Sequence, residues 1–314
     1  CGNIRDVSAL GGVTTLSLSN CSNVADVCAL GGLTYLNLSR CSKIRDVSAL
    51  GNVNTLSFSY CNLISDVSAL GGVKTLAISC CRNITDVSAL GTVPNLSLSC
   101  CSNITDVSAL RGVTTLDLSF CGGITDVSSL DRVTDPNLSC CRNVVNVSAL
   151  GGVTTLDVSG CTKITDVSAL GKVTNLNIGS CKLITDVSSL CEVTTLNLTG
   201  CDNITDVSAL GRVTTLSLSF CRKITDVSTL GGVKHLDISR CNNITDVSAL
   251  GRVTTLNIYG CNVTDVSALG RVHTLHLSDF ADTIGINELS GVTNLKLSRV
   301  ISEAEERTRT LGGT

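Results

Sequence analysis

The chain has 314 residues, a net charge of −3 and only 2% aromatic residues, with neither Met nor Trp. Its Lys and Arg residues are scattered and make no broad basic face, which disfavours nucleic acid as a partner. No apolar run reaches the roughly 18–20 residues that a membrane-spanning helix needs, and no signal peptide is visible. The chain starts on Cys1, inside a repeat, so we expect a fragment or a processed product.

A twenty-residue repeat begins at Cys1 and continues almost to the end of the chain. The unit reads C-x-N-I-T-D-V-S-A-L-G-x-V-T-T-L-x-L-S-x, and we number its positions as slots 1 to 20. Cys fills slot 1 as far as Cys261, one residue is then lost, and Phe280 and Val300 follow in that slot. Such a period predicts a solenoid. We expect about fifteen coils over residues 1–300 and a polar cap or tail over residues 301–314.

Each coil is predicted to run from a corner through turns, 3-10 or extended segments to a short strand at slots 15–19. Apolar side chains occupy slots 1, 4, 7, 10, 13, 16 and 18, and the final step of two is the period of a strand. The Gly of slot 11 marks a turn. Neighbouring strands would pair in parallel at about 4.8 Å and form a sheet on one face. One coil cannot fold alone, so stacking must supply the stability.

The segment L-x-x-V-x-x-L-x-L-x-x-C, as in Leu110 to Cys121, resembles the leucine-rich repeat segment L-x-x-L-x-L-x-x-(N/C). The following N-I-T-D-V-S-A-L resembles the I-x-D-I/V-x-x-L segment of internalin-like repeats. This resemblance covers residues 1 to about 300 and implies a leucine-rich repeat solenoid. The unit is shorter than the usual internalin-like repeat, and Cys replaces the usual Asn.

Nineteen cysteines raise the question of metal binding or disulfides. Slot 1 falls on the inward phase, so we expect a ladder of buried, reduced thiols that bond weakly to loop carbonyls. A single-file row does not surround a metal ion, and parallel Cβ vectors are wrongly oriented for disulfides. Free thiols favour a reducing intracellular compartment, although the localisation stays open. Outside the ladder, Cys80 and Cys100 share slot 20 in adjacent coils, and we expect them to pair if any cysteines oxidise.

Aspartate fills slot 6 in almost every coil, and only Asn146 interrupts the row. A calcium stripe is one interpretation, but calcium needs six to eight oxygens around each ion. We favour a turn in which the side chain accepts backbone N–H bonds, because Asn146 can do the same.

Enzymatic function is not expected. The spacing of His273 and His276 fits a metal site, but their slots place them on different sides of a strand entry. The serines have no positioned base, and no phosphate-binding glycine motif is present. We predict no catalytic, cofactor-binding or metal-binding residues.

Function is expected on the strand face, where slots 15, 17 and 19 should point outward beside the variable slot 20. Exposed aromatic and Arg side chains are the usual anchors of interfaces. The candidate partner-binding residues are Tyr35, Arg40, Tyr60, Asp117, Phe120, Asp157, Phe220, His235, Asp237, Arg240 and Tyr259. We predict a non-enzymatic scaffold that binds a protein partner. A structural array protein and an ice-binding solenoid with Thr and Ser rows are the alternatives.

Two regions are predicted to be weak. Residues 131–147 break the repeat at Asp131, Pro136, Val145 and Asn146, and Pro136 removes one ladder hydrogen bond. We expect the N-terminal coil to expose its core face unless more protein precedes it. We expect a monomer, with end-to-end association possible through that coil.

Overall fold

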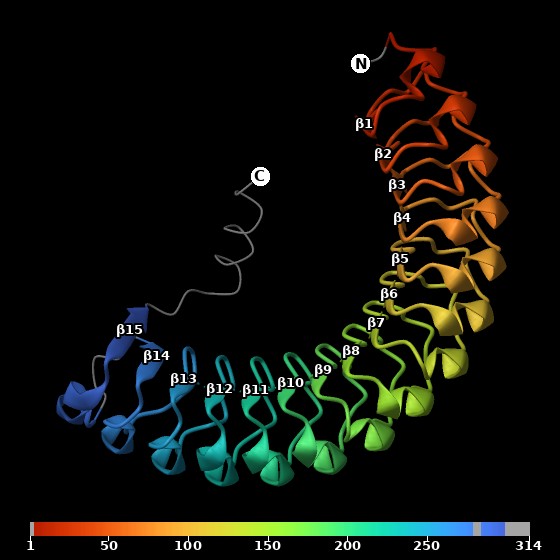
Figure 1. Ribbon diagram of the computed structural model, residues 1–314. Helices are drawn as coiled ribbons and strands as arrows, with labels where there is room; N and C mark the ends of the chain where they lie inside the picture. Colours follow the sequence, from red (N-terminus) through yellow and green to blue (C-terminus); the bar gives the residue numbers. More distant parts are fainter. Residues whose placement is uncertain (1–2, 279–283, 299–314) are drawn as a thin grey trace. The chain divides into compact units, whose positions relative to one another are not determined.

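The computed structural model describes residues 3–278 and 284–298, so the expected cap at 301–314 lies outside the described residues. Contacts divide the chain into two units, Cys1–Leu183 and Ile184–Thr314. Within each unit the coils are stacked with their strands along one side and their 3-10 segments along the other (Figure 1). The described residues therefore have the solenoid architecture that the repeat predicts.

The strands of each unit are parallel and pair in register with the next strand of the chain. In the first unit they are β1 (Thr15–Ser17), β2 (Tyr35–Asn37), β3 (Thr55–Ser59), β4 (Thr75–Ser79), β5 (Asn95–Ser97), β6 (Thr115–Asp117), β7 (Asp135–Asn137), β8 (Thr155–Asp157) and β9 (Asn175–Asn177). In the second unit they are β10 (Thr195–Asn197), β11 (Thr215–Ser217), β12 (His235–Asp237), β13 (Thr255–Asn257), β14 (Thr274–Ser278) and β15 (Asn294–Ser298).

The opposite side of each coil is a 3-10 segment that starts at slot 8 in the regular coils. In the first unit these are η1 (Ser8–Leu10), η2 (Cys28–Leu30), η3 (Ser48–Leu50), η4 (Ser68–Gly72), η5 (Ser88–Thr92), η6 (Ser108–Gly112), η7 (Ser128–Leu130), η8 (Ser148–Gly152) and η9 (Ser168–Leu170). In the second unit they are η10 (Ser188–Glu192), η11 (Ser208–Arg212), η12 (Ser228–Gly232), η13 (Ser248–Leu250), η14 (Ser267–Leu269) and η15 (Ile286–Gly291).

Most strands are shorter than predicted, because slot 17 usually ends them. Where slot 17 is Asp or Asn, its side-chain oxygen accepts the N–H of slot 19, as Asn37 does from Ser39 at 2.9 Å. This local bond turns the backbone out of the ladder. The five-residue strands β3, β4, β14 and β15 carry Ser, Ala, His and Lys in slot 17, although β1, β5 and β11 are short with Ser there.

The seven apolar slots form the core, as predicted. In the third coil each of the seven side chains is at most 2% exposed: Cys41, Ile44, Val47, Leu50, Val53, Leu56 and Phe58. Burying a side chain of this kind contributes about 1.5–3 kcal/mol before entropy is counted. Because each side chain is covered by the coil on either side, the stability belongs to the stack.

The slot-1 cysteines form a buried ladder, and their thiols bond to slot-18 carbonyls, which in most coils lie in the loop just past the strand, as predicted. All thirteen described ladder cysteines, Cys21 to Cys261, are buried. The thiol of Cys41 donates to the carbonyl of Leu18, just after β1, with an Sγ···O distance of 3.1 Å. Burial raises the pKa of the Cys41 thiol to about 11 and that of Cys141 to about 12. The ladder thiols are therefore protonated packing groups.

The slot-6 aspartates lock the turn that leads into each 3-10 segment, as predicted. Asp106 Oδ1 accepts the N–H of Ser108 at 2.8 Å, and this bond lowers the pKa of Asp106. Asn146 accepts the N–H of Ser148 at 2.9 Å in the same way. No group of three or more His, Cys, Asp or Glu residues that could hold a metal ion occurs within residues 3–278 and 284–298.

The coil that contains Pro136 is locally disrupted. Slots 18 and 20 of each coil donate their N–H groups to slots 17 and 19 of the next coil, as Leu118 does to Asn137 at 2.8 Å. By the alternation of a parallel strand, slot 16 donates to the same side. Pro136 has no N–H, and the pairing of β7 with β8 shrinks to Asn137 opposite Asp157, whereas its pairing with β6 keeps three residue pairs.

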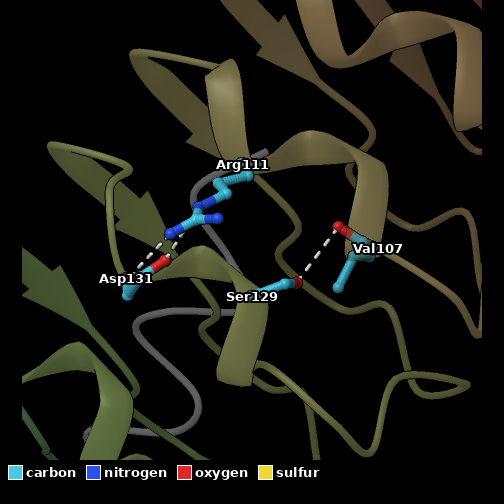
Figure 2. A network of polar contacts seen from close by, with 4 residues as sticks. All are labelled: Val107, Arg111, Ser129 and Asp131. Carbon is cyan, nitrogen blue, oxygen red and sulfur yellow. Dashed lines mark hydrogen bonds and ion pairs between the residues drawn. The ribbon is translucent and has the colours of Figure 1, made fainter.

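The same coil lacks its slot-11 glycine. At Gly91, an added Cβ would lie 2.1 Å from the carbonyl oxygen of Ala109 in the next coil. Arg111 and Asp131 occupy this slot in adjacent coils and form an ion pair, with 3.5 Å between Nε and Oδ1 (Figure 2). Both side chains are well exposed, so the pair adds little stability.

Candidate functional site

Within each unit, the side chains of slot 20 form a row at the corner after each strand, which we call the slot-20 rim. Its φ angle is positive in every coil from Asn20 to Gly260, between 56° and 72°. The N–H of each rim residue typically donates to the slot-19 carbonyl of the next coil, as Tyr60 does to Ser79 at 2.9 Å. The left-handed conformation costs a residue with a Cβ about 1–2 kcal/mol.

Bulky residues nevertheless occupy several rim positions. Tyr60 and Phe120 are 51% and 55% exposed and have φ of 58° and 60°. Gly or Asn would relax the backbone at these positions. Large side chains held in an unfavourable conformation at the surface point to a role other than stability.

In the second unit the rim continues into a stacked group that we call the aromatic–arginine row: Phe220, Arg240, Tyr259 and His276. The guanidinium of Arg240 lies 5.6 Å from the ring centre of Phe220 and 5.3 Å from that of Tyr259. Tyr259 in turn stacks on His276, with ring centres 5.3 Å apart. Arg222 flanks the row at 5.9 Å from the Phe220 ring. Each contact joins neighbouring coils or neighbouring slots, so the row is held rigid by stacking.

His276 closes the row as a neutral ring. Burial, and then the charge of Lys296, lower the pKa of His276. Its Nε2 lies 3.1 Å from the hydroxyl oxygen of Ser298 on β15. The row therefore carries its positive charge on Arg240 and presents uncharged rings on either side at neutral pH.

In the first unit a second stacked group begins at Arg40. Its guanidinium lies 5.3 Å from the ring centre of Tyr60. The Tyr60 hydroxyl hydrogen-bonds the thiol of Cys80, and this bond raises the pKa of Tyr60. The thiols of Cys80 and Cys100 also interact with each other, and the structure contains both as free thiols.

The slot-17 carboxylates are less available than the sequence indicated. Asp117, Asp157 and Asp237 are half-buried, and each accepts the N–H of slot 19 at 2.8–3.0 Å. The second oxygen of Asp157 accepts from Asn177 at 2.9 Å. These three side chains therefore mainly cap the ends of their strands. The slot-15 candidates Tyr35 and His235 are exposed at the start of their strands.

Three slot-19 hydroxyls are buried rather than exposed on the strand face. Ser119, Ser219 and Ser239 are at most 8% exposed, and the hydroxyl oxygens of Ser219 and Ser239 lie 2.8 Å apart. The expected outward side chains of slot 19 therefore form an internal hydroxyl row in these coils.

Two members of the site were not among the sequence candidates. His276 lies in slot 17 of the strand face that the sequence predicts, but it is not among the candidate partner-binding residues, and Arg222 lies in slot 2, outside the strand. The available signal was the register: slot 17 of β14 lies opposite Asn257, two residues before Tyr259.

The family model for the leucine-rich repeat matches residues 113–128 and 190–210. The solved structures that resemble the chain include an internalin, InlF, from Listeria monocytogenes. It is 22% identical, with a TM-score of 0.63, over 94% of this chain and 88% of that one. The functional domain of InlJ from the same organism, which includes a cysteine ladder, is 22% identical, with a TM-score of 0.52, over 90% and 72% of the two chains.

A leucine-rich repeat protein of Leptospira interrogans has 14% identity and a TM-score of 0.54 over 98% of this chain and 97% of that one. No curated protein sequence matches the chain. These likenesses agree with the repeat and the parallel strands described above, and the ladder of InlJ is a counterpart of the slot-1 cysteines.

Proposed function

Since the chain is a leucine-rich repeat protein, we propose that it binds a protein partner through the aromatic–arginine row and the adjoining slot-20 rim. Leucine-rich repeat proteins generally mediate protein–protein interaction. The observation that carries the proposal is the placement of Arg240 between Phe220 and Tyr259 on the strand side of the solenoid.

Stacking prepares this surface for binding. Arg and aromatic side chains dominate the energetics of protein interfaces when they are fixed before the partner arrives. Each cation–π contact contributes about 0.5–1 kcal/mol at an exposed site, and it removes rotamer freedom that binding would otherwise cost. A partner segment with a carboxylate for Arg240 and an apolar side chain for the Phe220 ring matches this chemistry.

Ice binding is less well supported. That function would use open, regular rows of hydroxyls, whereas the slot-19 hydroxyls bond to each other, as Ser119 does to Ser99 at 3.1 Å. The outward slot 15 keeps its Thr residues in several strands but is interrupted by Tyr35 and His235.

The proposal is tested by selecting peptides from a displayed random library against the full chain. Binding of the selected peptides is then measured by calorimetry against Phe220→Ala and Arg240→Ala. We expect each variant to weaken the selected peptides by about 10- to 100-fold, the range of interface hot spots.

The matched control is Arg252→Ala, which removes an exposed Arg of slot 12 on the opposite side of a coil. It should leave peptide affinity within about twofold, since a distant surface charge contributes little. Equal losses in Arg240→Ala and Arg252→Ala, or no loss in either rim variant, would place the binding surface elsewhere.

A further inference from the structure

We propose that Cys80 and Cys100 form a dithiol site on the slot-20 rim that hydrogen peroxide converts reversibly into an intramolecular disulfide. This site is separate from the aromatic–arginine row and does not depend on the proposed partner binding.

The two cysteines hold the same slot in adjacent coils, so the fold brings their backbones together. The N–H of Cys80 donates to the carbonyl of Ser99, next to Cys100, at 2.9 Å. Adjacent strands lie about 4.8 Å apart, within the 4.4–6.8 Å between Cα atoms that a disulfide spans. The parallel Cβ directions of stacked coils must turn toward each other when the S–S bond forms. Both side chains are half-buried, so a small oxidant can reach them.

Their surroundings distinguish the roles of the two sulfurs. The Tyr60 hydroxyl and the Cys100 thiol both interact with the Cys80 thiol. Burial, together with the bond to Cys80, raises the pKa of Cys100, so this thiol keeps its proton near neutral pH. We assign Cys80 to the first attack and Cys100 to the second.

The reaction is balanced with one peroxide. The Cys80 thiolate attacks one peroxide oxygen, the O–O bond breaks, and the departing hydroxide takes a proton to become water. This step leaves a sulfenic acid on Cys80. The sulfur of Cys100 then displaces the S–OH oxygen as a second water and forms the S–S bond, its proton going to that water. Two thiols thus supply the two electrons that reduce one peroxide.

The neighbouring cysteines do not compete for this reaction. Cys81 and Cys101 follow in the chain but are fully buried, and burial raises their pKa to about 12 and about 11. Cys140 also occupies slot 20 and is half-buried, but its neighbours in that slot are Phe120 and Gly160. It is therefore a matched thiol without a partner thiol.

The test is to treat the full chain with a small excess of hydrogen peroxide, block the remaining thiols after unfolding, and digest with trypsin. Cleavage after Lys74, Arg82 and Arg111 places Cys80 in peptide 75–82 and Cys100 in peptide 83–111. Mass spectrometry should find these two peptides joined, with fragment ions that map the bond to Cys80 and Cys100. Dithiothreitol should separate them again.

Two variants assign the roles, and Ser fits the slot because Ser180 occupies it naturally. In Cys100→Ser, Cys80 should accumulate a sulfenic acid that dimedone traps. In Cys80→Ser, Cys100 should be recovered as a blocked thiol. Absence of the joined peptides while Cys140 oxidises as fast as Cys80 would overturn the proposal. Links between molecules, or links through Cys81 or Cys101, would overturn it as well.

Discussion

Slots 20 and 1 are adjacent in the chain, but they behave in opposite ways. Cys221 is fully buried and donates to the carbonyl of Leu198 at 3.1 Å. Phe220, one residue earlier, is half-exposed in a left-handed conformation with Arg240 over its ring. Slot 1 keeps one residue type in nearly every coil, whereas slot 20 changes from coil to coil.

The contrast separates the residues that hold the coils together from those that can carry a specific function. A residue that every coil repeats makes the same contact with the next coil, so its recurrence reflects architecture. A side chain that differs between coils does not have to make this repeated contact with the next coil. The rim is accordingly where the molecule can carry specific function.

The largest expected difference between the two slots is in thiol reactivity. In the native chain at about pH 8, iodoacetamide should label the ladder thiols at least about 100-fold more slowly than Cys80, Cys100 and Cys140, since the thiolate is the reactive form. Burial raises the pKa of Cys41 and Cys241 to about 11 and about 12. Peptide mapping after timed labelling measures the rates. Peptide 133–142 contains both Cys140 and the ladder Cys141, so fragment ions must separate the two labels. Ladder thiols that label as fast as Cys140 would contradict the expected difference.

A smaller effect is expected from repairing the disrupted coil. Pro136→Leu should stabilise its coil by about 1–3 kcal/mol, because a buried Leu and one ladder hydrogen bond are restored. Native-state hydrogen exchange should show slower amides in β7 and β8. Pro94→Thr is the control: it also restores one backbone N–H, which in other coils bonds the slot-14 carbonyl of the preceding coil, but it adds no buried side chain. It should therefore stabilise its coil by less than Pro136→Leu does. Faster exchange in Pro136→Leu would contradict the account of β7.

The smallest effect is expected at the rim itself. Phe120→Gly should change the free energy of unfolding by less than about 1 kcal/mol, because relief of the left-handed strain offsets the greater freedom of Gly in the unfolded chain. Urea unfolding measures it. The reverse change at the same slot, Gly160→Ala, should cost more, since its new Cβ would lie 2.9 Å from the sulfur of Cys140. A large loss of stability in Phe120→Gly would show that the rim side chains stabilise the fold.

The fold could be predicted from the sequence because one twenty-residue repeat specifies every coil. Seven apolar slots specify the core, and a single Asn146 among aspartates distinguishes a turn from a calcium site. The predicted strands were too long, because the prediction extended them past slot 17 on the basis of the apolar residues in slots 16 and 18. The capping bond that Asp or Asn of slot 17 makes is a polar signal in the same segment, visible at Asn37 and Asp117.

The candidate site was predicted less completely. Phe220, Arg240 and Tyr259 were identified as variable surface residues, but their stacking depends on side-chain directions in three successive coils. The left-handed rim did have a signal in the sequence. Slot 20 contains Gly160, Gly200, Gly260 and Asn20, and Gly and Asn are the residue types that tolerate a positive φ.

The in-register pairing of each strand with the next also has a mechanical consequence. Within each unit the ladder hydrogen bonds reach the next coil, as from Leu118 to Asn137, and the thiol bonds reach a carbonyl 23 residues earlier, as from Cys41 to Leu18. A pull on one end would therefore detach coils in sequence, each releasing about 20 residues, or roughly 65–70 Å of extended chain. Under tension such a chain lengthens in nearly equal steps and refolds onto the coils that remain, in the manner of an extensible tether.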